Sequence, residues 1–597
     1  MRCCQKMFGA NDRKNLEMGG DCTFQTDTWP HGIDDKIPAT TFNHTVQQRN
    51  RCVRRFQNQL FLPHFQVFCC LFLLLNPSIT LALIADAKEI ERQLAKPASL
   101  SLSKNGLADL QRFYAARNSQ PVWVTANPAS SLLDTALTFI AHAETEGLDS
   151  EDYQLQHLQQ LQHHAGQSAS AAVELEVLTT HAVLMLARDL ARGHLTAAAA
   201  DKDWHIPQRA FDAVAFLQEA LKKDRLQPAF DELSPKNPSY QSLKQTLAHY
   251  RQLAGNHTEW VHIPTSPSIR PGDTHPHIPL IRQRMVQAYA ADGVAEYHIA
   301  ASGNQHYDHE LVTAVKAFQA QHGLNSDGVI GKNTLRAMNR PLTWKIRQLR
   351  INMERLRWLP GNLGARYLLV NTAGFKLSAF ENDEQVLDMR IIVGRDYRST
   401  PSFNGALSHM VINPYWNVPV SIAVKDLLPK QQSDPMFFTN GGFKIYPGNN
   451  RNGEPIDPDT IDWHSLKRGF PYVLRQDPGK HNALGRLKFM FANSFDIYLH
   501  DTPSKSLFQR DIRTFSSGCI RLEKPLELAA FALNKESLWE KFTENMEGDK
   551  TITTHLPKPL PIYLVYITAW ANGPDKLVHF YPDIYDRDSS TLRYARW

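Results

Sequence analysis

Residues 487–522 read LKFMFANSFDIYLHDTPSKSLFQRDIRTFSSGCIRL, and the alternation in their first half decides the fold class of this part of the chain. Successive side chains of a strand point to opposite faces, so apolar residues spaced two apart predict a half-buried strand. Two such runs meet at Asn493-Ser494, which predicts a β-hairpin. The residues expected to face the core are Leu487, Phe489 and Phe491 in the first strand and Phe495, Ile497 and Leu499 in the second.

The polar face of the second strand carries reactive side chains. Tyr498 and His500 share this face, and Cys519 follows 19 residues after His500. A thiol ionises readily only beside a base, a positive charge or a helix N-terminus. His500 could supply the base and Arg521 the charge. The alternative interpretation is a buried, inert cysteine beside a surface histidine.

The residues directly before the cysteine are small. Gly518 lets the backbone turn tightly, so its amide and that of Cys519 could face a developing oxyanion. Cys519 is also the only cysteine after residue 70, since the other six lie within the first 70 residues. Together these features predict a site for covalent acyl transfer.

This segment resembles the signature of the L,D-transpeptidase catalytic (YkuD-type) family, a histidine followed after a short spacer by [S/T]-H-G-C. Here the 15 residues 501–515 separate His500 from Ser516-Ser517-Gly518-Cys519. Ser517 departs from the pattern, because many members have a second histidine there. The "SSGC" form, the helical N-terminal region and the long insertion resemble the large YcbB-like branch of gram-negative murein L,D-transpeptidases.

The resemblance implies a mechanism. Cys519 would attack a diaminopimelate carbonyl in a peptidoglycan tetrapeptide stem, and the amine of a neighbouring stem would resolve the thioester into a 3→3 crosslink. His500 would be the general base for both steps. Ser517 cannot titrate as a histidine would, but it can orient His500. The resemblance also implies acylation of Cys519 by carbapenems and a role in cell-wall biogenesis and cell shape.

Other residues near this segment have two interpretations each. Tyr498 orients His500 or contacts substrate, or else packs as a buried aromatic ring. Arg521 binds a substrate carboxylate, or else forms an ion pair with Glu523. Trp416 and Tyr415 line a groove or pack in the core.

Patterns elsewhere in the chain predict its organisation. The apolar spacing of Leu133, Leu137 and Ile140 is helical, whereas a period of two begins at about Trp344 and indicates a β-rich domain of about 250 residues. The string AVKAFQAQHGLNSDGVIGKNTLRAMN (314–339) resembles the peptidoglycan-binding domain 1 family, a three-helix module. The expected fold is multidomain α+β: an N-terminal extension with a signal peptide at 1–87, a helical scaffold at 88–263, a Pro-rich linker at 264–276, a peptidoglycan-binding module at 277–340, and a mostly-β catalytic domain at 345–597 with a lid-like, Gly- and Pro-rich insertion at about 421–484.

The first residues indicate export. Arginines between 49 and 55 precede an apolar run at 67–75, and Ala85-Asp86-Ala87 has the small residues of a cleavage site. This pattern predicts a secretory signal and a periplasmic protein, with an uncleaved inner-membrane anchor as the alternative. A formal net charge of +5 over 597 residues argues against a nucleic-acid partner. Peptidoglycan stems are the expected partners, and other murein synthases could be as well.

Three rival functions remain open at this stage. A carboxypeptidase would use the same acyl-enzyme with water as acceptor, and a transferase to an outer-membrane lipoprotein would use a lysine amine. A wall-anchoring protein would need neither Cys519 nor His500. No H-E-x-x-H motif occurs, so the sequence predicts no metal and no cofactor.

Overall fold

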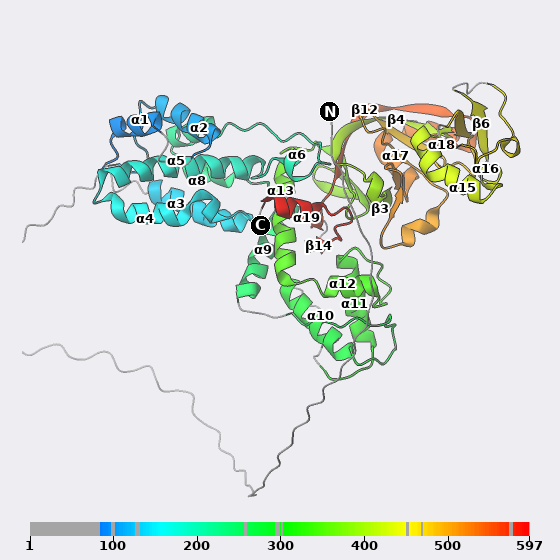
Figure 1. The fold of residues 1–597 in the computed structure, drawn as a ribbon, viewed down its shortest axis with the longest axis horizontal. Coiled ribbons are helices and arrows are strands. Elements are labelled where there is room, and N and C mark those ends of the chain that lie inside the picture. The colour runs from blue at the N-terminus through cyan, green and yellow to red at the C-terminus, as the bar shows by residue number, and fades with distance from the viewer. Residues whose placement is uncertain are drawn as a thin grey trace, which may run out of the picture. The chain divides into compact units, whose positions relative to one another are not determined.

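The N-terminal region is helical, as predicted, and is built around the long helix α5 (Ala169–Arg192) (Figure 1). The Ser168 hydroxyl caps its first turn, and Gly193 ends it with a positive φ of 95°. The computed structural model describes residues 84–96, 102–125, 132–255, 260–292, 299, 302–448, 453–466, 470–571, 577–595 and 597. The neighbouring helices are α1 (Ala87–Ala95), α2 (Lys104–Ala115), α3 (Leu132–His142), α4 (Leu155–Ala165), α6 (Ala197–Ala200), α7 (Ala213–Lys222), α8 (Leu226–Asp231) and α9 (Pro238–Gly255).

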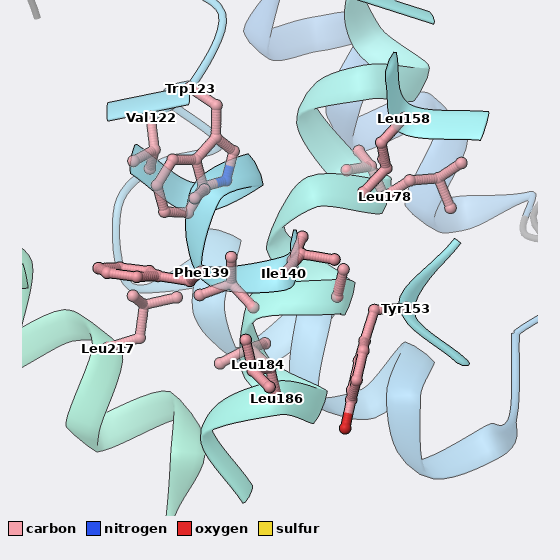
Figure 2. Packing of buried hydrophobic residues seen from close by; sticks show 14 of the residues in the cluster. Val122, Trp123, Phe139, Ile140, Tyr153, Leu158, Leu178, Leu184, Leu186 and Leu217 are labelled. Atoms are coloured by element: carbon pink, nitrogen blue, oxygen red, sulfur yellow. The ribbon is translucent and has the colours of Figure 1, made fainter. Parts of the chain in front are cut away.

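Helix α5 is covered on most of its surface. Leu184 and Leu186 of α5 share a buried cluster with Phe139 and Ile140 of α3 (Figure 2). Within the described residues α5 is the helix long and apolar enough to cross a membrane, but 67% of its apolar window is buried inside the protein. Its composition is therefore accounted for by a core position in this domain.

A buried carboxylate ties the turn at 122–124 to α5. Glu176 accepts hydrogen bonds from the backbone amides of Val122 (2.7 Å), Trp123 (2.8 Å) and Val124 (2.9 Å) and from the hydroxyl of Tyr114 (2.8 Å). Burial raises the pKa of Glu176. These four donors satisfy a carboxylate that would otherwise be costly to bury.

The prediction of alternation from Trp344 is wrong, because residues 342–358 form the helix α13 (Leu342–Trp358). The second half of this helix, residues 351–358, is buried on every face, so it lacks the one-sided apolar stripe that marks an amphipathic helix in a sequence. Its polar residues are paired inside the protein: Arg355 with Asp588 (2.5 Å) and Arg357 with Glu354 (3.0 Å). Strands begin only after this helix.

The predicted three-helix module is confirmed. It consists of α10 (Ile278–Asp292), α11 (His309–Gln321) and α12 (Lys332–Met338), and Gly323 follows α11 with a positive φ of 67°. The segment 264–276 is not a free linker. The backbone of Ile269 pairs with that of Ile330 in both directions, and Ile269 is buried in the core of the module.

The β-rich region forms a nine-stranded sheet in the order β10-β3-β11-β9-β8-β4-β12-β1-β2. Strand β3 also pairs with β2, which closes the sheet on itself. Helix α17 (Pro525–Leu533) adds Leu528 and Leu533 to its core. The strands are β1 (Arg366–Asn371), β2 (Lys376–Glu381), β3 (Glu384–Gly394), β4 (Phe403–Ile412), β8 (Leu487–Phe491), β9 (Leu499–His500), β10 (Thr514–Ser516), β11 (Ile520–Leu522) and β12 (Ile552–Val565); the C-terminal elements are α18 (Glu536–Glu547), the pair β13 (Ala569–Trp570) and β14 (His579–Phe580), and α19 (Arg587–Ala595).

The hairpin predicted at 487–499 forms with a shorter second strand. Phe489 pairs with Leu499, so both lie on the core face as predicted, but the pairing is shifted by two residues from a turn at Asn493-Ser494, and the strand β9 contains only Leu499 and His500. The Asn493 side chain bonds the backbone of Phe491, Phe495 and Ile497, and this polar cap replaces ladder pairing.

The insertion at 421–484 is more regular than its composition indicates. Its strands β6 and β7 form a three-stranded sheet with β5, which lies just before residue 421, and the insertion has a core of its own around Phe438, Trp463 and Leu474. Aromatic side chains from several short elements form this core, so no helical or strand periodicity in the sequence predicts it. The elements of this region, from the strand that precedes the insertion onward, are β5 (Trp416–Asn417), α14 (Val420–Ile422), the π-helix η5 (Ala423–Leu427), α15 (Leu428–Ser433), α16 (Phe437–Asn440), β6 (Phe443–Pro447) and β7 (Tyr472–Gln476).

Of the predicted N-terminal extension and signal peptide at 1–87, residues 1–83 lie outside the described residues. At the predicted cleavage site, the Asp86 carboxylate caps α1 by accepting from the amides of Lys88 and Glu89. Ala85 is buried, and its amide bonds the Val124 carbonyl. Cleavage after Ala87 would therefore remove the cap of the first helix.

Candidate active site

Two short parallel strands bring the predicted residues together. Leu499 pairs with Ile520, and His500 pairs with Arg521. The amide of Ile520 donates to the carbonyl of Tyr498, so Cys519 lies beside Tyr498. Because side chains alternate along a strand, this register puts the side chains of 498, 500, 519 and 521 on one face.

The Cys519 thiol is held by Tyr498. Both the backbone N–H and the hydroxyl of Tyr498 donate to Sγ, and Sγ lies 3.8 Å from the carbonyl oxygen of Asp496. Burial raises the pKa of Cys519, while the two Tyr498 bonds, Lys488 and Arg521 oppose that rise. The thiol is thus protonated at rest, with donors in place for a thiolate. The structure therefore assigns Tyr498 a contact with the thiol. The rings of Tyr498 and His500 lie 5.7 Å apart, but no hydrogen bond between the two side chains among the described contacts supports the predicted role of orienting His500.

His500 is buried and neutral at pH 7. Burial lowers its pKa to about 3, helped by the positive charges of Arg521 and Lys488 and opposed by hydrogen bonds to the carbonyls of Asp501 and Leu484. Nδ1 lies 2.5 Å from the Asp501 carbonyl, which fixes a proton on this nitrogen. The ring is oriented by the backbone rather than by Ser517.

Arg521 does not form the ion pair with Glu523 that was one interpretation. Glu523 is bound by Arg390, through its amide and its guanidinium. The Nε of Arg521 is buried without a hydrogen-bond partner among the described residues. Burial and Arg395 lower the pKa of Arg521, whereas Cys519 raises it, so the guanidinium faces the thiol and another arginine.

The turn before Cys519 is fixed by hydroxyl groups. The Ser516 hydroxyl donates to the Cys519 carbonyl (2.5 Å) and accepts from the Gly518 amide (3.1 Å). Gly518 has φ of 119°, a conformation that side chains disfavour. Its amide is occupied by Ser516, which corrects the expectation that it faces an oxyanion; the Cys519 amide remains a predicted donor.

Ser517, at the position of the missing histidine, turns toward the insertion. Its hydroxyl donates to Asp426 (2.9 Å) rather than to His500. Trp416 is half-buried and packs on the insertion core, yet it also hydrogen-bonds the Tyr498 side chain and so links that core to the site. Tyr415 is exposed, and Arg475 lies over its ring.

Sequence reasoning missed two residues of the site. Lys488 pairs with His500 across the hairpin, and its ammonium lies 3.9 Å from the centre of the Tyr498 ring. The alternation at 487–491 already placed Lys488 on the polar face, so this residue was discoverable. Asp426 comes from a distant segment and had no such signal. Within the described ranges, no three His, Cys, Asp or Glu side chains gather where they could hold a metal ion.

Comparison with known families shows which protein family the residues of this site resemble. Residues 365–552 match the model of the L,D-transpeptidase catalytic domain. These residues are an L,D-transpeptidase catalytic domain. Residues 108–247 match a scaffold domain, and residues 294–338 match the family described as "Putative peptidoglycan binding domain".

Individual proteins resemble parts of the chain. A Haemophilus influenzae protein described as "Putative L,D-transpeptidase" is 38% identical over 243 residues, which are 40% of this chain and 48% of the relative, so the chain spans about half the length of the curated relative it matches. Solved L,D-transpeptidases from Xylanimonas cellulosilytica and Stackebrandtia nassauensis are 16% and 13% identical, each over 51% of this chain and over 99% and 97% of their own, with TM-scores of 0.17 and 0.20. Scores this low carry no argument.

Tyr498→Phe in the L,D-transpeptidase domain is expected to slow alkylation of Cys519. The variant removes a hydroxyl bond that lowers the thiol pKa, so the pKa rises further and less thiolate is present at pH 7. One hydrogen bond of about 1 kcal/mol corresponds to roughly a fivefold slower reaction with iodoacetamide. Tyr594→Phe, at an exposed tyrosine of α19, is the matched control. An unchanged pH midpoint for alkylation would contradict the assigned bond.

Acylation of Cys519 in this domain is expected to persist in mild acid. A histidine with an ordinary pKa would be about 97% protonated at pH 5, a roughly 30-fold loss of base. With a pKa of about 3, His500 stays neutral, and acylation should fall less than about threefold between pH 7 and 5. The stability that neutral His500 contributes is complete above about pH 6.5 and is lost as the pH falls toward 3. Circular dichroism at each pH controls for unfolding, and an acid limb near pH 6 in folded protein would contradict the buried state.

Proposed function

We propose that the protein is a periplasmic murein L,D-transpeptidase that forms 3→3 diaminopimelate crosslinks through a Cys519 thioester. One observation carries the proposal: within the matched catalytic domain, parallel strands put Cys519, its donor Tyr498 and neutral His500 on one face. Export to the periplasm is part of the proposal and rests on the signal pattern alone.

The chemistry follows from the protonation states. Cys519 Sγ attacks the carbonyl carbon between diaminopimelate and the terminal D-Ala of the donor stem, and the thiol proton passes to neutral His500. The protonated imidazole then donates this proton to the leaving D-Ala amine. In the second half-reaction His500 takes a proton from the acceptor amine as it attacks the thioester, and Cys519 recovers a thiol. A base that is neutral at rest suits both half-reactions.

Product analysis tests the proposal. Purified protein is incubated with disaccharide-tetrapeptides that contain diaminopimelate, and the products are analysed by mass spectrometry. Dimers that disappear in Cys519→Ala support a transpeptidase. Tripeptide monomers alone would replace the proposal with the carboxypeptidase, and unchanged substrate would favour the wall-anchoring protein. A lysine-containing peptide as acceptor tests transfer to a lipoprotein.

A further inference from the structure

The insertion touches the candidate site through the carboxylate of Asp426, which is 11% exposed. Its Oδ2 accepts from the Ser517 hydroxyl at 2.9 Å and from the Arg398 guanidinium at 2.7 Å. Its Oδ1 lies 3.8 Å from the Arg395 guanidinium and 3.4 Å from the Tyr397 hydroxyl. The carboxylate is therefore bound by two arginines and two hydroxyl groups.

The groups that bind Asp426 are fixed to the backbone around Cys519. The amide of Arg395 donates to the Ser516 carbonyl (3.1 Å), and the Thr400 hydroxyl donates to the Gly518 carbonyl (2.8 Å). Any side chain at Gly394 would lie 2.0 Å from the Arg398 carbonyl oxygen, so only glycine allows the loop 395–400 to fold back here. The loop that carries the arginines is thus joined to the cysteine turn by hydrogen bonds at both of its ends.

Asp426 belongs to a different unit. It lies on the π-helix η5, and the insertion packs around its own core of Phe438, Trp463 and Leu474. Arg398 also donates to the carbonyl of Ser421, so the start of the insertion rests on the same arginine. The Asp426 carboxylate, which belongs to the insertion, thus occupies a basic surface beside the cysteine turn. Another carboxylate could replace it there without unfolding the insertion or the turn.

Positive charge exceeds negative charge at this place. Arg395 and Arg398 bind one carboxylate, and Arg521 lies nearby, since both Arg395 and the thiol influence its titration. Arginine binds carboxylates with strong, oriented hydrogen bonds. A peptide whose carbonyl reaches Cys519 brings carboxylates with it: that of the terminal D-Ala, a few bonds from the scissile carbonyl, and that of the diaminopimelate side chain.

We propose that Arg395, Arg398 and Ser517 form a subsite for a carboxylate of the donor stem, and that Asp426 fills this subsite when no donor is bound. The inference rests on the proposed function, because it takes a peptide stem as the ligand. Donor binding replaces the Asp426 carboxylate by that of the peptide and frees the insertion from the cysteine turn. Asp426 is thus a competitor of the substrate.

Binding to the Cys519→Ala protein tests the subsite without catalysis. Isothermal titration calorimetry compares three ligands: the tetrapeptide stem, the same stem ending in D-alaninamide, and the stem with its diaminopimelate side-chain carboxylate amidated. One of the two amides is expected to bind about tenfold more weakly than the stem, and this amide identifies the carboxylate. Equal affinities for all three ligands would overturn the proposal.

Variants separate a competitor from a structural contact. Asp426→Asn is expected to tighten binding of the stem by about five- to tenfold and to leave the discriminated amide unchanged. Arg398→Gln should weaken binding of the stem to the affinity of that amide. Arg398→Lys keeps the charge and should lose less affinity for the stem, and it replaces the Gln variant in the test if that variant does not fold. Asp434→Asn is the matched control, at an exposed acid of the insertion whose side chain accepts only from the Met436 amide among the described contacts. Weaker binding of every ligand to Asp426→Asn would make Asp426 a support of the site and overturn the proposal.

The outcome is distinguishable from failure of the proposed function. If the wild type forms dimers with the same KM for stems and amides, the subsite is wrong and the transpeptidase stands. If no stem binds and none acylates Cys519, both proposals fall.

Discussion

His500→Ala is expected to slow acylation of Cys519 by a carbapenem by about 100- to 10,000-fold, the usual contribution of a general base. The thiol is protonated at rest because burial raises its pKa, so attack requires an acceptor for the proton, and the buried, neutral imidazole is that acceptor. A carbapenem presents a strained acyl group to the same sulfur. Its adduct on Cys519 is followed by intact-mass spectrometry over time.

Two controls make the result specific. His464→Ala removes an exposed histidine of the insertion and should leave the rate unchanged. Imidazole added to the buffer should restore part of the rate of His500→Ala, because the variant leaves space where the ring was. A folded His500→Ala protein that is acylated at the wild-type rate would show that His500 is not the base.

Glu176→Ala is expected to cost about 3–5 kcal/mol of stability in the helical region, the usual effect of breaking a buried charged network. The variant leaves three backbone amides at 122–124 without their acceptor in the core and removes one of the hydrogen bonds of the Tyr114 hydroxyl, which keeps those to Thr180 and to the backbone carbonyl of residue 176. Urea unfolding should show an earlier transition. Hydrogen exchange read by mass spectrometry should show faster exchange at 122–124.

The neighbouring acid provides the control for this variant. Glu174 lies on the same helix and is partly exposed, and its ion pair among the described residues is with His157, at 3.5 Å. Glu174→Ala is expected to change stability by less than about 0.5 kcal/mol. If both variants unfold alike and amide exchange at 122–124 stays slow, the carboxylate of Glu176 does not hold this turn.

Much of the fold was predictable wherever an element has one buried and one exposed face. The alternation at 487–499 predicted which residues of the hairpin face the core, and the helical spacing of Leu133, Leu137 and Ile140 predicted a helix where α3 lies. Helix α13 was missed because its second half, residues 351–358, is buried on every face, and because Arg355 in that half is neutralised by Asp588, far away in the chain. The segment 264–276 was misread because its prolines are typical of a linker, although Ile269 is buried in the module.

The site divides in the same way. The sequence by itself determined the chemistry: one thiol, one histidine on the polar face of a strand, a glycine turn and an arginine, in a spacing that resembles a known family. Only the tertiary structure decided their states and partners. Burial makes His500 neutral, Tyr498 rather than His500 bonds the thiol, and Asp426, some 90 residues earlier in the chain, binds Ser517. The physical reason is that strand periodicity is a local property, whereas desolvation and charge pairing depend on segments that only folding brings together.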